Sequence, residues 1–438
     1  MDFRYTASLL LPFVLLIGGC AAAEAPPAEP APSPVVETTR PTFDAAAMDA
    51  ILSGAVERGE VIGVSALVFD EGEVVYQGAF GLRDREAGLP VTDDTVWRIF
   101  SMTKPITSAL IMDLIEDGLV ALDDPVADYI PELAAMQVAS LGEDGRPVFT
   151  PQARPMTVED LLLHRAGLSY GIFGGNPIED AYAAADLFRA DEGLGPKMER
   201  LSRLPLIAQP GEMWMYSYSI DVLGRIAEIV TNQALDELMA ERIFEPLGMT
   251  DTGFFVRPEA VDRFAALYVL QPDGSFARLD PDPDNVFAPD FTVDHDFHMG
   301  GGGLVSTQRD YARFAQMILD GGVYEGTRVL EPETVALMLQ DHLGEGFPSV
   351  LPWLGGDTNV GFGYGGSVQK SATAEQQREL GQYAGQWGWG GAARTDMYVD
   401  PENDAFGIIM LQFFGGPDPQ IHADFQAEAL RQTRDDRP

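Results

Sequence analysis

The sequence contains almost no cysteine and few histidines, which restricts the chemistry that it can support. Cys20 is the only cysteine among 438 residues, so an intramolecular disulfide and a cysteine-based metal site are both excluded. The five histidines follow no metal-ligand spacing, and no glycine-rich nucleotide-binding motif or Walker motif is present. We therefore expect a protein that needs neither a metal ion nor a cofactor.

Positive charge is also scarce. Lys and Arg number 28 against 68 Asp and Glu, which gives a formal net charge of −40. Phosphate backbones and anionic membrane surfaces repel such a chain, so neither nucleic acid nor an anionic lipid surface is expected as a partner. Solubility is the simplest reason for the charge, and recognition of a cationic substrate is the alternative.

The N-terminus reads as an export signal. Residues 9–17 form an apolar run that is too short to cross a bilayer and is typical of a signal peptide. The run ends in Ile17-Gly18-Gly19-Cys20, which resembles a bacterial lipobox, in which the cysteine is lipidated. Because the only cysteine falls at the cleavage position, we expect a lipid anchor at Cys20 rather than plain secretion. The protein would then be exported and lipid-anchored to the bacterial cell envelope, at its periplasmic or outer-membrane face.

The composition divides the chain into three segments. Residues 1–20 are the predicted lipoprotein signal peptide, 21–42 are a Pro- and Ala-rich tether that cannot bury a core, and 43–438 are the folded domain. The folded part is long enough for one large domain or two intimate ones. The sequence does not predict its oligomeric state.

Strand patterns occur near both ends of the folded domain and helical patterns in its middle. The predicted fold class is α/β (α+β), with an antiparallel sheet from both chain ends, flanked by helices, and an inserted mainly helical region. The sheet region covers about residues 43–104 and 305–438, and the helical region about 105–304. Ser101 falls at the junction of these regions, where a cleft is expected.

Local signals place the main elements. The runs 62–69 and 73–80, split by Asp70-Glu71-Gly72, predict a β-hairpin. The four glycines 300–303 require either close passage of the backbone or positive φ. The polar segment 370–382 is expected to be a solvated insertion rather than a flap over the cleft. Further predictions are a strand at 95–100, helices at 106–116, 178–204, 219–231, 307–319 and 419–434, and strands at 360–368, 383–389, 394–399 and 405–413.

Ser101 and Lys104 lie where the predicted strand gives way to a helix. Residues three apart share a helix face, so the Lys104 ammonium can reach the Ser101 hydroxyl if the helix has begun by Ser101. That gives a serine nucleophile with a lysine as its base, at a helix N-terminus whose free N–H groups favour negative charge. An N-cap serine beside a solvated lysine is the ordinary alternative, because so short a motif also occurs by chance.

Two further stretches could complete such a site. Tyr216 lies at a loop-to-helix junction, and near a lysine ammonium it could be partly ionised, for which its phenol pKa of about 10 would have to fall by roughly 2–3. Trp389-Gly390-Gly391-Ala392 precedes a strand, and a free N–H at Ala392 paired with that of Ser101 would form an oxyanion hole. A core tyrosine and a tight turn with a packed tryptophan are the alternatives.

Taken in order, these motifs resemble a known family. Ser-Met-Thr-Lys, then Pro-Gly-x-x-Trp-x-Tyr-Ser, then Trp-Gly-Gly before a Val-Asp-Pro strand resembles the serine β-lactamase-like superfamily. More narrowly it is similar to the family VIII carboxylesterases, which share the β-lactamase/transpeptidase-like fold of class C β-lactamases and D-Ala-D-Ala peptidases. The resemblance implies that Ser101 is acylated, that Lys104 is its base partner, and that Tyr216 relays the proton to the leaving group. Supporting matches lie at 161–168, 245–249 and 301–307.

Two departures from the lactamase pattern bear on the substrate. Tyr218 stands where class C enzymes have an asparagine, and Trp389-Gly390-Gly391 replaces Lys-Thr-Gly, whose lysine would bind a lactam carboxylate. Both changes are compatible with the esterase branch, so these four residues are expected to bind an uncharged substrate.

The sequence therefore predicts a serine carboxylesterase that acts on small or short-chain esters. A β-lactamase or a D-alanyl-D-alanine carboxypeptidase-type cell-wall hydrolase stays open, because Arg394 could supply the missing cation. A non-enzymatic envelope protein that retains the fold is the second alternative, and the intact Ser101, Lys104 and Tyr216 argue against it.

Overall fold

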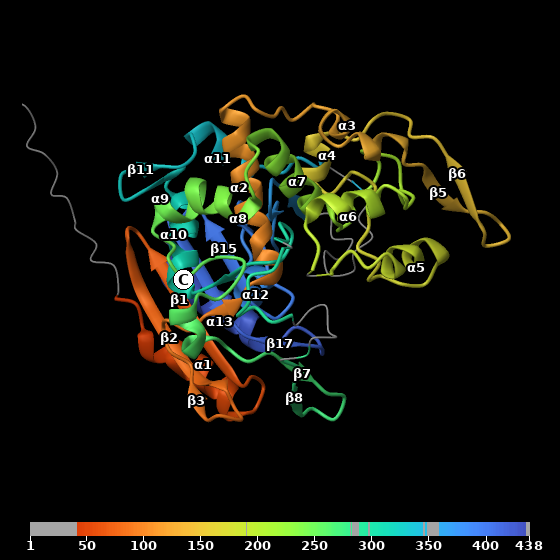
Figure 1. Ribbon diagram of the computed structural model, residues 1–438. Helices are drawn as coiled ribbons and strands as arrows, with labels where there is room; N and C mark the ends of the chain where they lie inside the picture. Colours follow the sequence, from red (N-terminus) through yellow and green to blue (C-terminus); the bar gives the residue numbers. More distant parts are fainter. Residues whose placement is uncertain are drawn as a thin grey trace, which may run out of the picture. The chain divides into compact units, whose positions relative to one another are not determined.

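Both ends of the chain contribute strands to one antiparallel sheet of eight (Figure 1). The computed structural model describes residues 42–189, 191–280, 282, 289–296, 298–344, 347 and 359–434. The strand order is β12-β13-β14-β15-β16-β1-β2-β3, so the N-terminal hairpin adds directly to the C-terminal strand β16. The strands are β1 Gly63–Asp70, β2 Glu73–Asp84, β3 Leu89–Pro90, β12 Val360–Phe362, β13 Ser367–Gln369, β14 Trp387–Gly388, β15 Asp396–Asp400 and β16 Ala405–Met410. The predicted fold class is confirmed.

The hairpin β1–β2 forms because its loop matches the twist of the strands. Glu71 and Gly72 both have positive φ, at 47° and 90°, and Asp70 pairs with Glu73 across the loop. Two-residue loops of this kind suit the right-handed twist of paired strands. β1 is paired on both sides and buried on both faces, which is why its sequence is a nearly continuous apolar run. The predicted hairpin is confirmed.

Alternate residues of β1 enter two separate hydrophobic cores. Val64, Ala66 and Val68 pack with helices α1 (Ala45–Glu57) and α13 (Gln420–Thr433). Leu67 and Phe69 point to the opposite face, into the larger core that contains α2 (Thr103–Glu116) and α10 (Gln308–Leu319). Because side chains alternate along a strand, one strand holds the two helical layers apart and fixes α2 against the sheet.

The middle of the chain forms a mainly helical region, whose elements α3 to α6, with β5 and β6, lie to the right of the sheet in Figure 1. Its central helix α7 (Ser219–Thr231) packs against α2 and α4. The stretch predicted as helical over 178–204 contains two helices, and the hairpin β5–β6 was not predicted. The helices are α3 Val126–Tyr129, α4 Val158–Leu162, α5 Pro177–Ala184, α6 Leu194–Leu201, α8 Leu235–Met239 and α9 Glu245–Leu247.

Shorter elements complete the described part of the chain. The strands are β5 Val138–Leu141, β6 Pro147–Thr150, β7 Tyr268–Leu270, β8 Phe276–Arg278, β10 Val323–Tyr324, β11 Thr327–Arg328 and β17 Phe413–Phe414. The helices are α11 Pro332–Met338 and α12 Ala374–Leu380, with single turns at Phe100–Met102, Pro131–Ala135, Ala240–Phe244 and Pro258–Arg263. No helix among the described residues is long and apolar enough to cross a bilayer.

Strand β4 (Trp97–Arg98) carries the chain to the nucleophile segment. It pairs with β9 (Val305–Ser306), and the Ile99 N–H donates to the Leu304 carbonyl at 3.0 Å. The strand predicted over 95–100 is shorter because the chain turns at Phe100. This pairing brings Ser101 beside the glycine run 300–303.

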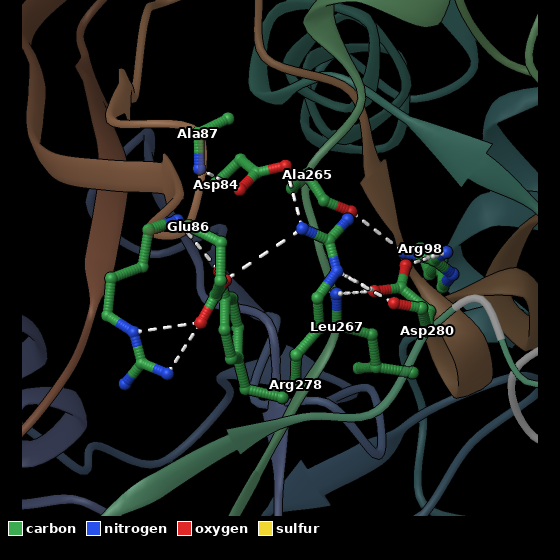
Figure 2. A network of polar contacts seen from close by, with 10 residues as sticks. Asp84, Glu86, Ala87, Arg98, Ala265, Leu267, Arg278 and Asp280 are labelled. Carbon is green, nitrogen blue, oxygen red and sulfur yellow. Dashed lines mark hydrogen bonds and ion pairs between the residues drawn. The ribbon is translucent and has the colours of Figure 1, made fainter.

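A buried ion pair anchors β4. Figure 2 shows the Arg98 guanidinium facing Asp280, with Arg278 beside the same carboxylate. The nitrogen–oxygen distances are 2.5 Å for Arg98 and 3.4 Å for Arg278. Arg98 also donates to the Ala265 carbonyl, and Asp280 accepts the Leu267 N–H. Breaking one partner of a buried pair usually costs about 3–5 kcal/mol, so this network holds the strand that precedes the nucleophile in a single position.

The segment 370–382 packs on the C-terminal helix. Thr373 forms a capping box with Gln376 and starts α12, which contacts α13. A Cβ at Gly381 would lie 2.7 Å from backbone atoms of Gln426, so the two elements are in close contact. The predicted signal peptide, the tether up to residue 41 and Cys20 lie outside the described residues.

Candidate active site

The Ser101 turn begins with an unusual backbone conformation. Phe100 has a φ of +43°, which an aromatic residue adopts only when its surroundings impose it. Its side chain packs with Leu267, Ala393 and Phe414, and these contacts fix the conformation. The turn leaves Ser101 on the wall of a cavity, in the first turn of a helical segment, where backbone N–H groups have no acceptor inside the helix. No signal in the sequence marks this positive φ.

Lys104 is buried directly beside the nucleophile. Its side chain is 2% exposed, and Nζ lies 3.3 Å from Ser101 Oγ. Nζ also donates to the Gly301 carbonyl and lies 4.4 Å from the centre of the Tyr216 ring. Burial lowers the pKa of Lys104 to about 7, against the opposing effect of the Asp221 carboxylate. A substantial fraction of Lys104 is therefore neutral at neutral pH and able to accept a proton.

Tyr216 is the second side chain in contact with Ser101. Its hydroxyl shares a hydrogen bond with Ser101 and accepts one from Trp389 Nε1 at 3.2 Å. Burial raises the pKa of Tyr216, although both hydrogen bonds act in the opposite direction. The fall in pKa that partial ionisation of Tyr216 would require is therefore not found in the free protein, because burial penalises the phenolate more than the polar contacts favour it. Tyr216 is protonated at neutral pH and can donate.

Gly391 lets the loop before β15 approach the Ser101 segment. A Cβ at this position would lie 2.4 Å from the Ile99 carbonyl oxygen and 2.2 Å from Thr395 Oγ1. The Gly391 N–H donates to the Thr395 carbonyl, whereas the next N–H, that of Ala392, has no acceptor within the described residues. Ala392 lines the cavity together with Ser101. Two N–H groups are thus available at one place for a developing oxyanion.

Four residues expected to bind substrate do not line the cavity in the described structure. Tyr218 is buried behind Tyr170 and Phe188, with ring centres 4.6 and 5.1 Å apart. Trp389 reaches the Tyr216 hydroxyl, and Gly390 and Gly391 contribute by bringing the backbone close. Tyr218 and Trp389 therefore contact residues that line the cavity.

The cavity itself has a volume of about 170 Å³ and a mainly apolar wall. Lys104 is its only charged side chain in the described part of the chain, and His295 is a further polar group. The apolar lining consists of Phe100, Ile172, Phe188, Phe254, Pro289, Phe291 and Met299, with Tyr170 and Tyr216 beside them. Sequence reasoning missed this set, because scattered aromatic residues in loops give no signal of their own.

The glycine run 300–303 forms another side of the cavity. None of these glycines has positive φ, so of the two expectations, close backbone passage is the correct one. A Cβ at Gly301 would lie 2.7 Å from Asp221 Oδ2 and 2.8 Å from the Tyr170 hydroxyl. Gly303 is equally enclosed, by the Met299 backbone and Phe254.

Arg394 is engaged elsewhere. Its guanidinium pairs with Asp418 and donates to the carbonyls of Gly415 and Gly416 at 3.1 and 2.9 Å. It is not among the residues that line the cavity. Arg394 therefore does not supply the cation that a lactam carboxylate would require.

His164 supports Tyr216 from behind. The imidazole is buried, with Nδ1 3.3 Å from Ser217 Oγ and its ring centre 4.9 Å from that of Tyr216. Burial and the nearby Lys104 charge lower the pKa of His164 well below its usual range. The side chain is therefore neutral and packs as part of the wall that holds Tyr216.

The fold and these residues together define a serine hydrolase in which a buried lysine lies beside the nucleophile. The chain belongs to the Beta-lactamase family, whose profile matches residues 48–431. The resemblance to the serine β-lactamase-like superfamily and its family VIII esterase branch is thereby confirmed.

Several individual proteins are similar to this chain. Protein Rv1367c of Mycobacterium tuberculosis (strain H37Rv) is 36% identical over 362 residues, which cover 81% of this chain and 87% of that protein. Esterase EstB of Burkholderia gladioli is 31% identical over 385 residues, covering 84% and 89%. The solved structure of simvastatin synthase (LovD) from Aspergillus terreus superposes with a TM-score of 0.73 at 24% identity, covering 89% of this chain and 98% of that one. The last comparison shows a shared fold.

Proposed function

We propose that the protein is a serine carboxylesterase that hydrolyses small, uncharged esters through an acyl-enzyme on Ser101. The observation that carries this proposal is the apolar cavity at Ser101, where Lys104 is the only charged side chain among the described lining residues. A substrate carboxylate would lose its hydration there with no cationic partner besides the proposed base Lys104, because Trp389 replaces the usual lysine and Arg394 is paired with Asp418. Esterase EstB, at 31% identity, supports the same activity class.

The chemistry follows from the positions of three side chains. Neutral Lys104 takes the Ser101 proton as Oγ forms a bond to the ester carbonyl carbon, and the N–H groups of Ser101 and Ala392 stabilise the oxyanion. The bond to the alcohol oxygen then breaks. Tyr216 protonates the departing alkoxide and recovers a proton from the Lys104 ammonium beneath its ring. Water attacks the acyl-enzyme by the reverse proton path and releases the acid.

A paired assay tests this proposal. The purified protein is offered p-nitrophenyl acetate, p-nitrophenyl butyrate and nitrocefin, with Ser101→Ala as the matched control. We expect ester turnover that is lost in Ser101→Ala, and a fluorophosphonate adduct on Ser101 by mass spectrometry. Nitrocefin hydrolysis faster than ester hydrolysis would instead favour a β-lactamase, and the absence of any Ser101 adduct would favour a non-enzymatic role.

We also propose that Cys20 carries a lipid that anchors the protein to the bacterial cell envelope. The support is the lipobox-like Ile17-Gly18-Gly19-Cys20 after an apolar run. Mass spectrometry of the mature N-terminus should find a diacylglyceryl group on Cys20 in the membrane fraction. A Cys20→Ala variant that remains in the membrane fraction to the same extent would contradict the anchor.

A further inference from the structure

Asp221 is a buried carboxylate for which the proposed chemistry has no direct use. It lies in the first turn of α7, is 1% exposed, and accepts the Gly301 N–H on Oδ1 at 3.1 Å. Within the described residues, its Oδ2 has no hydrogen-bond partner. Burying an ionised carboxylate with one free oxygen is costly unless a nearby charge compensates. Local packing alone therefore does not explain why a carboxylate is buried at position 221.

The Gly301 peptide connects Asp221 to the base. Its N–H points to the Asp221 carboxylate, and its carbonyl accepts the hydrogen bond from Lys104 Nζ. A side chain at position 301 would collide with Asp221 Oδ2 and with the Tyr170 hydroxyl, so only glycine allows this arrangement. The backbone of Gly301 thus hydrogen-bonds to the Asp221 carboxylate through its N–H and to the Lys104 ammonium through its carbonyl.

We propose that Asp221 is a positioning residue of this hydrolase site: its carboxylate holds the Gly301 backbone, whose carbonyl binds the Lys104 ammonium. The negative charge of Asp221 also favours the protonated form of Lys104. The inference rests on the proposed role of Lys104 as the base for Ser101. Asp221 itself does not contact Ser101 or the cavity among the described residues.

The other groups that face Lys104 and Asp221 also influence the pKa values of these two residues. Lys104 is faced by Ser101 of its own segment, Tyr216 from the loop before α7, Tyr170 from the loop after α4, and neutral His164 from the end of α4. Asp221 also feels the positive charge of Lys197 on α6. Asp221 is the only anion acting on Lys104 among the causes that shift the pKa of this lysine. Removing the Asp221 charge therefore removes this one electrostatic effect on Lys104 and leaves its neutral neighbours in place.

The direction of the effect follows from the charges. Burial lowers the pKa of Lys104 to about 7, and the negative Asp221 opposes that fall. An Asp221→Asn variant keeps the size of the side chain and an oxygen for the Gly301 N–H but loses the charge. The pKa of Lys104 should then fall further, by about one pH unit or more, which is the usual effect of a nearby opposite charge.

The chain offers a direct way to measure this, because it contains only three lysines, Lys104, Lys197 and Lys370. Full-length protein labelled with ¹³C at lysine Cε should give three signals whose pH titration can be followed by NMR, and Lys104→Ala identifies the signal of Lys104. We expect the Lys104 midpoint in Asp221→Asn to lie about one pH unit or more below the wild-type value. Glu179→Gln is the matched control, since Glu179 is a buried carboxylate of the same helical region that is bonded to Ser169.

An unchanged Lys104 midpoint in Asp221→Asn, or an equal shift in Glu179→Gln, overturns the inference. The wild-type protein gives a second test that needs no variant: because the two groups interact, the Lys104 signal should show another inflection where Asp221 titrates, above the usual carboxyl range because burial raises the pKa of Asp221. A single inflection would also overturn it. This titration does not depend on ester turnover, so it separates a failure of this inference from a failure of the proposed esterase activity.

Discussion

Lys104 and Tyr216 occupy the same buried space, and burial favours the neutral form of each. It lowers the pKa of Lys104 to about 7 and raises that of Tyr216 above its ordinary value of 10.0. A neutral lysine can accept a proton and a neutral tyrosine can donate one. The same environment therefore prepares a base and an acid that both contact Ser101, without a charged tyrosine in the resting protein.

The pH dependence of ester hydrolysis should report Lys104. The base must be neutral to act, and a group with a pKa of about 7 is neutral above that pH. We expect kcat/KM for p-nitrophenyl acetate to rise with pH and to level off above about pH 7. Stopped-flow or steady-state assays between pH 5 and 9 measure this limb, with thermal unfolding at each pH as the control for stability. A limb centred below pH 5, or none, would contradict the assignment of Lys104 as the base.

Replacement of Tyr216 by Phe should affect esters according to their leaving group. The variant keeps the ring that packs on His164 but removes the hydroxyl that protonates the alkoxide. Loss of a general acid typically costs 10²–10⁴-fold, so we expect about this loss of kcat/KM for an alkyl ester such as ethyl butyrate. A p-nitrophenyl ester should lose far less, because p-nitrophenolate leaves without a proton. Equal losses for both esters would show that Tyr216 acts on another step.

At the scale of an element, the loop before β15 brings the Ala392 N–H to the site because Gly391 has no side chain. A Gly391→Ala substitution would place a carbon 2.4 Å from the Ile99 carbonyl oxygen, and backbone cannot give way without moving the loop. We expect about a tenfold or larger loss of kcat, as for a weakened oxyanion donor, with a lowered Tm.

Gly195→Ala serves as the control for this substitution, since its added carbon would meet only the Arg225 guanidinium, at 3.8 Å. Circular dichroism melts and ester kinetics on both variants measure the changes in Tm and in kcat. Full activity in Gly391→Ala would mean that the close approach of the loop is not needed for catalysis.

Elements with strong local signals were predictable from the sequence, and the walls of the cavity were not. Helix α7 has the predicted bounds, 219–231, and ends at Asn232 with φ of 55°, as expected of a residue that tolerates the left-handed region. The hairpin β1–β2 followed from three turn residues. Phe100 and Asp221 carried no such signal, because the strain of one and the burial of the other arise from contacts between distant segments.

At the scale of the whole molecule, the net charge of −40 should make stability depend on salt. Excess charge of one sign destabilises the compact state by self-repulsion, and the Debye length falls from about 30 Å at 0.01 M to about 3 Å at 1 M ionic strength. We therefore expect the Tm to rise by a few degrees, on the order of 1 kcal/mol of unfolding free energy, between 10 mM and 0.5 M NaCl. Potassium and choline chloride should act alike, because screening does not depend on the cation. A Tm that is flat or falls with salt would mean that local ion pairs, which salt weakens, outweigh the repulsion of the molecule as a whole.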